Sequence, residues 1–451
     1  MATLKALFTR APGTPTAPGV HPEPLWSYRP RSDREAGDAV VSNLLLHWFP
    51  SKVFRPSLDW TYSFWLGTVS AALFLLLIVS GLPLLLLYVP SVERAYQSVK
   101  DLEYVVTFGW WIRAVHRISA HLMVVAVALH LVRVFLTGAY KNGVGQGQRR
   151  EWNWVLGVVM LLLTLFLSFT GYLLPWDQLA FWAVTVGTNI ASSIPWVGPT
   201  VRELLIGGRT IEQATLIRFY VLHCIMLPGA LGVLFAYHMW RVRKDGGLAR
   251  ADHDALSAET RETAPVTTKT YTLLGVARGT APTVKATSVE APEQTANAVP
   301  DLVRRAAIVT LGTFALVSIL ASGIPSPLEE PANPLVTPNP AKAPWYFLWL
   351  QEIVTDTTIR IGSFTINGAF LGGVILPGLL IGLLTVWPWL DRSGALSAGR
   401  WFPKDRRTQN AVFLAIVFVV LVFTVIGMYL RGPYWNFYWP WEAWPEIPAR
   451  I

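Results

Sequence analysis

Seven apolar stretches, separated by polar or Pro-rich segments, run along the chain. A helix needs about 20 apolar residues to cross the roughly 30 Å of hydrocarbon in a bilayer. We expect spans at Tyr62–Val89, Val105–Thr137, Val155–Leu174, Leu216–Trp240, Ala306–Ala321, Ile366–Leu390 and Ala411–Leu430. The pattern therefore predicts an all-α integral membrane protein that crosses the bilayer seven times.

The segments between the spans predict how the chain is divided. Residues 245–300 are rich in Ala, Thr, Glu and Pro without periodicity, which is typical of a flexible linker. A surface helix is expected near Val41–Phe49, and short interfacial helices are expected within Pro175–Thr215. The predicted parts are a cytoplasmic tail (1–57), a four-helix domain (58–244), a cytoplasmic linker (245–300), a three-helix domain (301–435) and a Trp-rich tail (436–451).

Composition and charge support a membrane protein with a defined orientation. The chain has 451 residues, of which 53% are hydrophobic and only 14% charged, and its 21 Trp suit interfacial belts. The net charge of +9 does not indicate nucleic-acid binding, because Lys and Arg cluster in the loops after spans two, four and six. The positive-inside rule then places the N-terminus in the cytoplasm and the C-terminus outside.

The N-terminal residues and the cysteine count exclude several classes of site. The first twenty residues lack an apolar h-region, so a cleaved signal peptide is not expected. Cys224 is the single cysteine, which excludes an intramolecular disulfide, a Cys-ligated iron–sulfur or zinc cluster, and a CxxCH haem attachment within this chain.

Two spans each carry a pair of widely separated histidines. His116 and His130 are 14 residues apart, and His223 and His238 are 15 apart, which corresponds to about 21 and 22 Å along a helix. Steps of this size bring each pair to roughly one helix face, with one imidazole toward each side of the bilayer. Isolated membrane histidines are usually polar contacts or proton relays, but two matched pairs favour bis-histidyl ligation of two haems.

The orientation assigns each pair of ligands to a depth. Both histidine spans run from outside to inside, so His116 and His223 are expected to hold an outer haem iron. His130 and His238 are expected to hold an inner one. His121 follows His116 by five residues on a different face, and we predict that it is not a ligand.

Glycines and arginines near these histidines are further candidate haem contacts. Spans one and three carry glycines spaced 14 apart, a spacing that would let a flat porphyrin edge approach the backbone, although Gly is also common in membrane helices. Arginines beside the histidines are candidate partners for haem propionates. For Arg133, the alternative is that its side chain extends to the membrane interface. The candidates are Gly67, Gly81, Gly157, Gly171, Arg113, Arg117 and Arg133. Pro228 is expected to bend span four and so reconcile its 15-residue spacing with the 14 of span two.

Several motifs together resemble one family over about residues 58–430. They are Gly109-Trp110, Arg113-Ala114-Val115-His116-Arg117, Gly171-Tyr172-Leu173-Leu174-Pro175-Trp176-Asp177-Gln178, Arg218-Phe219-Tyr220, Pro300-Asp301-Leu302 and Glu330-Pro331-Ala332-Asn333-Pro334. They resemble the cytochrome b/b6 family, the haem-bearing core of quinol:cytochrome c and quinol:plastocyanin oxidoreductases. The chain looks like cytochrome b6 and subunit IV fused through the 245–300 linker.

The resemblance implies quinone sites, at which this sequence departs from the family. Pro344 stands where the family has a glutamate thought to accept a quinol proton, while Tyr346 matches the family tyrosine. Asp177 and Glu352 are candidate substitutes, and either is equally suited to a structural or solvated role. Asp301 matches an acidic position at the inner quinone site and is a candidate for proton uptake.

The resemblance also implies cofactors, partners and a location. Trp65 occupies the place of a cysteine that attaches an extra haem in the plastid branch, so we predict two non-covalent b-type haems and no covalent one. Quinol would be oxidised outside, with one electron passing to a Rieske iron–sulfur protein and the other crossing both haems to a quinone inside. Expected partners are a c-type cytochrome or equivalent acceptor, other bc-complex subunits and a second copy of the complex, in a bacterial cytoplasmic membrane.

Two other functions compete with this prediction. A dihaem anchor that passes quinol electrons to another oxidoreductase would need four or five spans and no second membrane domain. A transporter with structural histidines would leave the matched glycine spacing unexplained.

Overall fold

The computed structural model describes residues 52–143, 149–245, 268–269, 284–285, 295–362 and 364–445. The expected surface helix at Val41–Phe49 lies outside them. Within the described residues, seven helices are long and apolar enough to cross a membrane, which confirms the predicted fold class. They span Leu66–Leu87, Gly109–Thr137, Arg150–Leu173, Gln213–Val242, Pro300–Gly323, Gly368–Leu390 and Lys404–Leu430.

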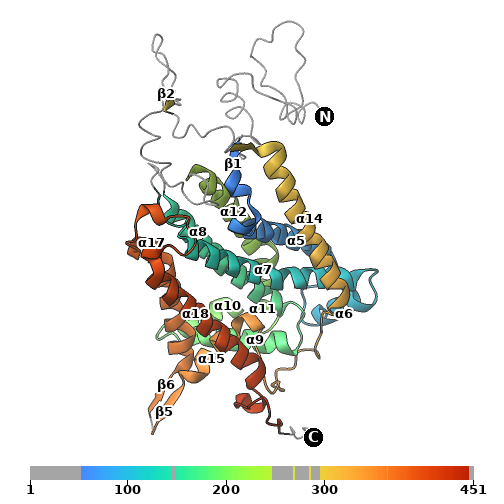
Figure 1. The fold of residues 1–451 in the computed structure, drawn as a ribbon. Coiled ribbons are helices and arrows are strands. Elements are labelled where there is room, and N and C mark those ends of the chain that lie inside the picture. The colour runs from blue at the N-terminus through green and yellow to red at the C-terminus, as the bar shows by residue number, and fades with distance from the viewer. Residues whose placement is uncertain are drawn as a thin grey trace.

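The first four spans form the centre of the molecule (Figure 1). Helix α5 (Leu66–Leu87) packs along α7 (Gly109–Thr137), and α8 (Arg150–Leu173) packs along α12 (Leu227–Lys244). Tyr88, at the end of α5, donates a hydrogen bond from its hydroxyl to the Leu174 carbonyl at 2.7 Å. This bond joins the outer ends of the first and third spans.

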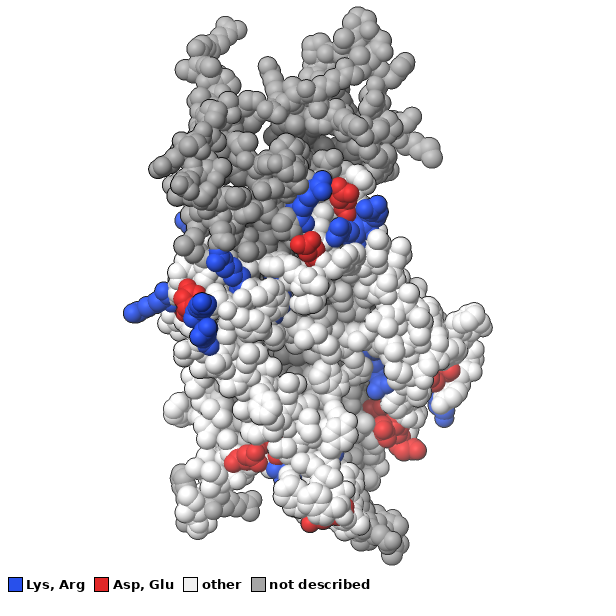
Figure 2. Space-filling model, in the orientation of Figure 1, with Lys and Arg blue, Asp and Glu red and all other residues white. Residues whose placement is uncertain are grey.

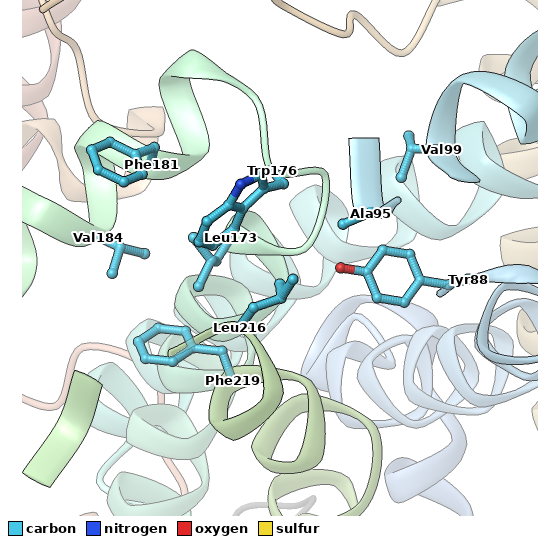
Figure 3. Close-up of a cluster of buried hydrophobic side chains, with 9 residues drawn as sticks. All are labelled: Tyr88, Ala95, Val99, Leu173, Trp176, Phe181, Val184, Leu216 and Phe219. Atoms are coloured by element: carbon cyan, nitrogen blue, oxygen red, sulfur yellow. The ribbon is translucent and has the colours of Figure 1, made fainter. Parts of the chain in front are cut away.

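The loops on the outer side contain short helices, as expected for Pro175–Thr215. Helix α6 (Ala95–Tyr104) lies between the first two spans, and α9 (Gln178–Ser192) and α10 (Gly198–Ile206) lie between the third and fourth. A fourth short helix, α11 (Gln213–Val221), begins span four. Figure 3 shows the apolar cluster that packs these loops together, with Trp176 and Leu173 beside Leu216 and Tyr88 near Ala95. This cluster fixes the loop that carries Asp177.

Span four contains a π-helical turn where we expected a proline bend. The π turn η2 (Leu222–Met226) joins α11 to α12 and includes His223. Such a turn inserts one extra residue into an α-helix, so it absorbs the residue by which the 15-residue spacing exceeds 14. The Pro228 prediction is therefore corrected: the π turn just before the proline makes the adjustment.

A second π turn stands in the same sequence context. The turn η5 (Leu371–Ile375) is followed by Leu376-Pro377-Gly378, just as η2 is followed by Leu227-Pro228-Gly229. Proline lacks an N–H and its ring crowds the carbonyl four residues earlier. A wider turn before the proline relieves that crowding, which gives a physical reason for both positions.

The last three spans lie on two sides of the central bundle and do not form a bundle of their own. Helix α14 (Val303–Gly323) packs against α5 and α7, where Val317 and Ala321 join a buried cluster with Leu73. Helix α17 (Leu376–Leu390) packs against α8, and α18 (Arg407–Val425) packs against α15 (Trp345–Asp356). Figure 1 shows α14 on one flank and α17 with α18 on the other. The last three spans thus flank the central bundle on two sides.

Short strands complete the description. Strand β1 (Lys52–Phe54) pairs antiparallel with β4 (Thr295–Asn297), so the end of the expected linker is paired with the end of the expected N-terminal tail. The π turn η4 (Ala298–Leu302) then leads into α14. The other pairs are β2 (Thr268–Lys269) with β3 (Val284–Lys285), and β5 (Ile359–Ile361) with β6 (Phe364–Ile366). The remaining elements are short. They are the helices α4 (Trp60–Ser63) and α16 (Gly368–Phe370), the π turn η8 (Ile426–Leu430), and the 3-10 turns η1 (Arg55–Leu58), η6 (Ala395–Ser397), η7 (Lys404–Arg406) and η9 (Pro433–Trp435).

A buried charged network joins the two halves at the end expected to face the cytoplasm. On the face shown in Figure 2, Lys and Arg gather toward this end. Arg406 is fully buried and donates to Asp391 Oδ2 at 3.0 Å, to the Phe135 carbonyl at 2.8 Å and to the Tyr140 hydroxyl at 2.6 Å. Lys141 Nζ donates to the Asp391 carbonyl at 2.9 Å.

Asp391 is the acidic centre of this network. Burial alone would raise the pKa of its carboxyl, but hydrogen bonds from Ser393 and Tyr140 and the charge of Arg406 lower that pKa to about 2. The carboxylate therefore stays ionised and holds the end of α17 against the end of α7. Lys141 and Arg406, which lie in the basic loops that predict the orientation, thus also hold the two halves of the chain together.

Candidate functional site

The outer histidines face each other across the centre of the bundle. The ring centroids of His116 on α7 and His223 in η2 are 6.2 Å apart, with the ring planes 75° to each other. His223 Nδ1 lies 3.0 Å from the Leu167 carbonyl and must carry the proton in that bond. Ser80 donates its own hydroxyl proton to Leu76 at 2.7 Å, so it accepts from His116 Nδ1 at 3.0 Å. Both rings therefore keep Nε2 free as a metal ligand.

The spacing of this pair fits bis-histidyl ligation. Two metal–nitrogen bonds of about 2 Å, with roughly 1 Å on each side from ring nitrogen to ring centre, give about 6 Å between centroids. The distance in the structure is 6.2 Å. A hydrogen bond at Nδ1 also orients a metal-bound imidazole and raises its basicity. His116 and His223 thus have a separation and Nδ1 hydrogen bonds with which both could hold one iron.

The inner histidines lie beside each other at the second level. His130 on α7 interacts electrostatically with His238 on α12 and with Arg133. Arg133 is buried, and its guanidinium lies 4.9 Å from the centre of the Tyr62 ring. The two histidine pairs therefore occupy two depths of one bundle, in the order that their sequence spacing predicts.

Three of the four predicted glycines pack directly against these imidazoles. A Cβ added at Gly81 would lie 3.2 Å from His116 Cε1, and one at Gly67 would lie 3.4 Å from His130 Cε1. At Gly171 the added carbon would lie 2.5 Å from His223 Cε1, closer than such atoms approach. At Gly157 it would meet nothing within 4 Å, which leaves open space beside helix three where a flat group could fit. The paired glycines thus make room on the histidine faces of α5 and α8.

Gly171→Ala is expected to weaken haem binding at the outer level by about tenfold or more, because overpacking of this kind costs about 1–3 kcal/mol. The added methyl must displace the His223 ring, which the Leu167 carbonyl holds. The measurement is haem per polypeptide together with the redox titration of the outer haem. Gly229→Ala, in the span that carries His223, is the control, because its Cβ would meet nothing within 4 Å. Full outer-haem occupancy in Gly171→Ala would contradict this close packing.

The arginines expected beside haem propionates differ in their surroundings. Arg113 pairs with Glu103 at 2.6 Å and donates to the carbonyls of Ser326 and Pro327 at 2.7 and 2.8 Å. Arg117 donates to the Pro325 carbonyl at 3.2 Å. These two arginines hold the loop after α14 against the outer end of α7.

A cluster of polar side chains lies beside the outer histidines. Arg117 on α7 interacts electrostatically with Tyr172 on α8, with Asp177 and with Tyr346 on α15. Burial raises the pKa of the Tyr346 phenol to about 12, and its hydroxyl bonds to Ser168 on α8. The predicted residues Asp177 and Tyr346, distant in sequence, are therefore brought to one place.

Asp177 is buried and caps a helix. Its Oδ1 accepts from the Ala180 N–H of α9 at 2.9 Å, and its Oδ2 accepts from the Glu329 N–H at 3.2 Å. Burial raises the pKa of this carboxyl, and the two backbone hydrogen bonds oppose that rise. The residue ties the loop after α8 to the loop after α14, and it would take up a proton more readily than an ordinary aspartate.

Two other predicted carboxylates lie elsewhere. Glu352 on α15 is 1% exposed and accepts hydrogen bonds from Arg431 Nε at 3.0 and 3.1 Å, with a further contact from Arg431 Nη2. Asp301 lies in η4 at the opposite end of the molecule and is half-buried. Pro344 immediately precedes α15 and forms its N-terminal cap position.

Comparison with known proteins assigns the family. The model for "Cytochrome b/b6/petB" matches residues 51–246, and the model for "Cytochrome b(C-terminal)/b6/petD" matches residues 331–439. Cytochrome b6 from Prochlorococcus marinus strain AS9601 is 42% identical over 196 residues, covering 44% of this chain and 86% of that protein. Cytochrome b6 from Synechococcus elongatus is 41% identical over 196 residues, with 44% and 87% covered. The chain belongs to the cytochrome b/b6 family.

The family assignment confirms several predictions made from the sequence. Both the b6-like and the subunit IV-like parts are present in one chain, as the fusion prediction states. A solved structure titled "Hyperthermophilic respiratory Complex III" shares the fold, with a TM-score of 0.63, 22% identity, and 84% and 86% of the two chains covered. As a cytochrome b/b6 protein, the chain is a multi-pass membrane subunit that transfers electrons and binds b-type haem non-covalently. This assignment overturns the transporter alternative.

The structure also identifies a contact that the sequence did not suggest. His121 was set aside as a non-ligand, and its Nδ1 accepts a hydrogen bond from Trp345 Nε1 at 3.0 Å. The only signal in the sequence was a third histidine inside a span that needed two. Its partner lies more than 200 residues away, so residue spacing could not reveal the contact.

Proposed function

We propose that this protein is the cytochrome b subunit of a bc-type complex that oxidises quinol at its outer side and reduces a quinone at its inner side. His116 with His223, and His130 with His238, would hold two b-type haems at the two levels. A haem held in this way accepts and passes on one electron at a time. The chain's own residues bind the substrates, orient the ligands and handle protons at the two surfaces.

The outer histidine pair is the observation that carries this proposal. Its 6.2 Å spacing and its Nδ1 hydrogen bonds suit ligation of one iron by both imidazoles. The inner histidines lie on the same two spans and interact with each other. Two ligand pairs at two depths provide a route for electrons across the bilayer. A single pair would serve only one side.

The outer polar cluster supports a quinol site next to the outer pair. Tyr346 and Asp177 approach Arg117, and Asp177 has a carboxyl that favours the protonated form more than usual. We infer that Asp177 is the better placed of the two candidate proton acceptors. Glu352 is neutralised by Arg431 in a buried ion pair, which would have to open before that carboxylate could accept a proton.

The inner site and the partners follow from the same proposal. Asp301 stands at the cytoplasmic end, where a quinone would take up protons during reduction. The outer electron acceptor would be a Rieske iron–sulfur protein that delivers electrons to a c-type cytochrome or equivalent carrier. The complex would contain further bc-type subunits, would be a homodimer, and would lie in a bacterial cytoplasmic membrane.

The test is a redox titration of the purified complex with haem counted per polypeptide. Two b-type haems of distinct midpoint potential, both reducible by quinol, and a co-purifying Rieske protein are the expected results. One haem, or a haem that remains covalently bound to this chain after extraction, would contradict the proposal. A complex that lacks the Rieske protein and instead contains another oxidoreductase subunit would support the dihaem anchor.

A further inference from the structure

His121 forms a hydrogen bond between the two halves of the chain at the outer site. It lies on α7, five residues farther along the helix than His116, and Trp345 at the start of α15 donates from Nε1 to its Nδ1 at 3.0 Å. The ring centroids of His121 and Tyr346 are 6.0 Å apart. His121 is not one of the four histidines proposed to hold haems, so its imidazole has no role in the proposed function.

The contact with Trp345 fixes the tautomer of the ring. An indole N–H can only donate, so His121 Nδ1 must be the nitrogen without a proton. A neutral imidazole has one N–H, and that N–H must then be on Nε2. Protonation of the ring would place an N–H on Nδ1 against the indole N–H. Trp345 therefore both selects the Nε2–H tautomer and opposes the charged form.

The remaining N–H is available for a ligand. Within the part of the chain that the structure describes, His121 Nε2 has no hydrogen-bond partner, and the side chain is half-buried. The polar groups of the outer cluster approach from three elements: Arg117 on α7, Tyr172 on α8, and Tyr346 on α15. Both a quinol hydroxyl and a quinone carbonyl have oxygens that accept hydrogen bonds.

We propose that His121 binds the substrate of the outer site by donating Nε2–H to a ring oxygen of quinol and quinone, and that Trp345 holds it in the donating tautomer. The inference rests on the proposed function, because it needs a quinol at the outer cluster. His121 takes up no proton in this role. The proton released by quinol therefore passes to another group, and Asp177 is the carboxyl available in the cluster.

Replacing His121 by phenylalanine tests the substrate contact in the intact purified complex. His121→Phe keeps a ring of similar size and removes both nitrogens. We expect the KM for a short-chain benzoquinol or naphthoquinol to rise about tenfold, which is the value of one hydrogen bond between neutral groups. His121→Gln keeps an amide donor and is expected to retain a KM near that of the native protein. Both variants should retain two haems with unchanged spectra.

Replacing Trp345 by phenylalanine tests the tautomer. Trp345→Phe leaves Nδ1 without its donor, so His121 becomes free to change tautomer and to protonate in the pH range where imidazoles titrate. We expect the KM of this variant to gain a pH dependence between pH 5 and 8 that His121→Phe, combined with it, abolishes. The titratable groups next to His121 are Arg117 and Tyr346, and Tyr172 and Asp177 interact with Arg117. All four are present in both variants, so their effects on the KM cancel in the comparison.

Trp349→Phe is the matched control for the tryptophan substitution. Its Nε1 donates to the Tyr346 carbonyl within α15 at 3.0 Å, so its removal leaves His121 Nδ1 bonded and the pH profile native. An unchanged KM in His121→Phe, or the same pH profile in Trp345→Phe and Trp349→Phe, would overturn the proposal. If the native complex shows no haem reduction by any quinol, the proposed function itself fails, and that result is separate from either variant.

Discussion

His238→Ala is expected to remove the inner haem and leave the outer one in place, which halves the haem content of the purified protein. His130→Ala should do the same, because His130 and His238 interact at the inner level and are proposed to hold the same haem. Without one of the two imidazoles proposed to hold it, the inner haem would keep a single protein ligand. The outer pair has its own hydrogen bonds to Ser80 and Leu167 and does not depend on the inner pair.

The measurement is the haem spectrum and midpoint potentials of each variant. In His130→Ala and His238→Ala, quinol should still reduce the remaining haem by one electron, while electron transfer to the inner quinone site should be lost. His121→Ala is the matched control, because it removes an imidazole from the same helix α7 and should leave both haems bound. Selective loss of the outer haem from the His238 variant would refute the assignment of depths.

Arg406→Ala is expected to destabilise the association of the last two spans with the central bundle by about 3–5 kcal/mol, the usual result of breaking a buried ion pair. Arg406 is 0% exposed and bonds to groups from both halves: Asp391 from the loop after α17, and Phe135 and Tyr140 from the end of α7. Removing it leaves the Asp391 carboxylate buried with fewer partners and opens a cavity next to the Phe135 ring.

Thermal unfolding in detergent, followed by the haem absorbance and by limited proteolysis of the 391–406 loop, tests this expectation. Arg407→Ala is the matched control, because the next residue is an exposed arginine with the same side chain. Arg406→Lys should fall between the two, since an ammonium keeps the charge but cannot form the same fork of bonds. Equal melting temperatures for Arg406→Ala and Arg407→Ala would show that the network does not hold the halves together.

The two depths of the histidine pairs could be predicted from spacing because a membrane helix is regular. Each residue advances about 1.5 Å and turns about 100°, so His116 and His130 must lie at two depths on nearly one face. The prediction for span four was less accurate, because it assigned the adjustment of the 15-residue spacing to Pro228. The structure has a π turn at Leu222–Met226. The spacing between histidines does not show whether a turn of the helix is α or π.

The quinone sites were harder to predict because their parts come from different spans. Tyr346 and Asp177 were identified by resemblance, but their approach to Arg117 depends on how α15 and the α8–α9 loop pack. Glu352 was a plausible substitute for the missing glutamate until the structure placed Arg431 against it. Spacing predicts that His121 is not a haem ligand, but it does not reveal the contact with Trp345, which exists only because the second half of the chain packs there.

The sequence by itself therefore determined the number of spans, the helical class and the two histidine pairs. Lipid provides no partners for backbone groups, so each span must satisfy its own hydrogen bonds as a helix, and its residues alone dictate that outcome. Only the tertiary structure decided that α14 packs on one side of the bundle and α17 on another, that Arg406 bonds to Asp391, and that Trp345 holds His121. Those contacts join segments far apart in the chain, and their geometry depends on side-chain packing among helices that hydropathy and spacing do not specify.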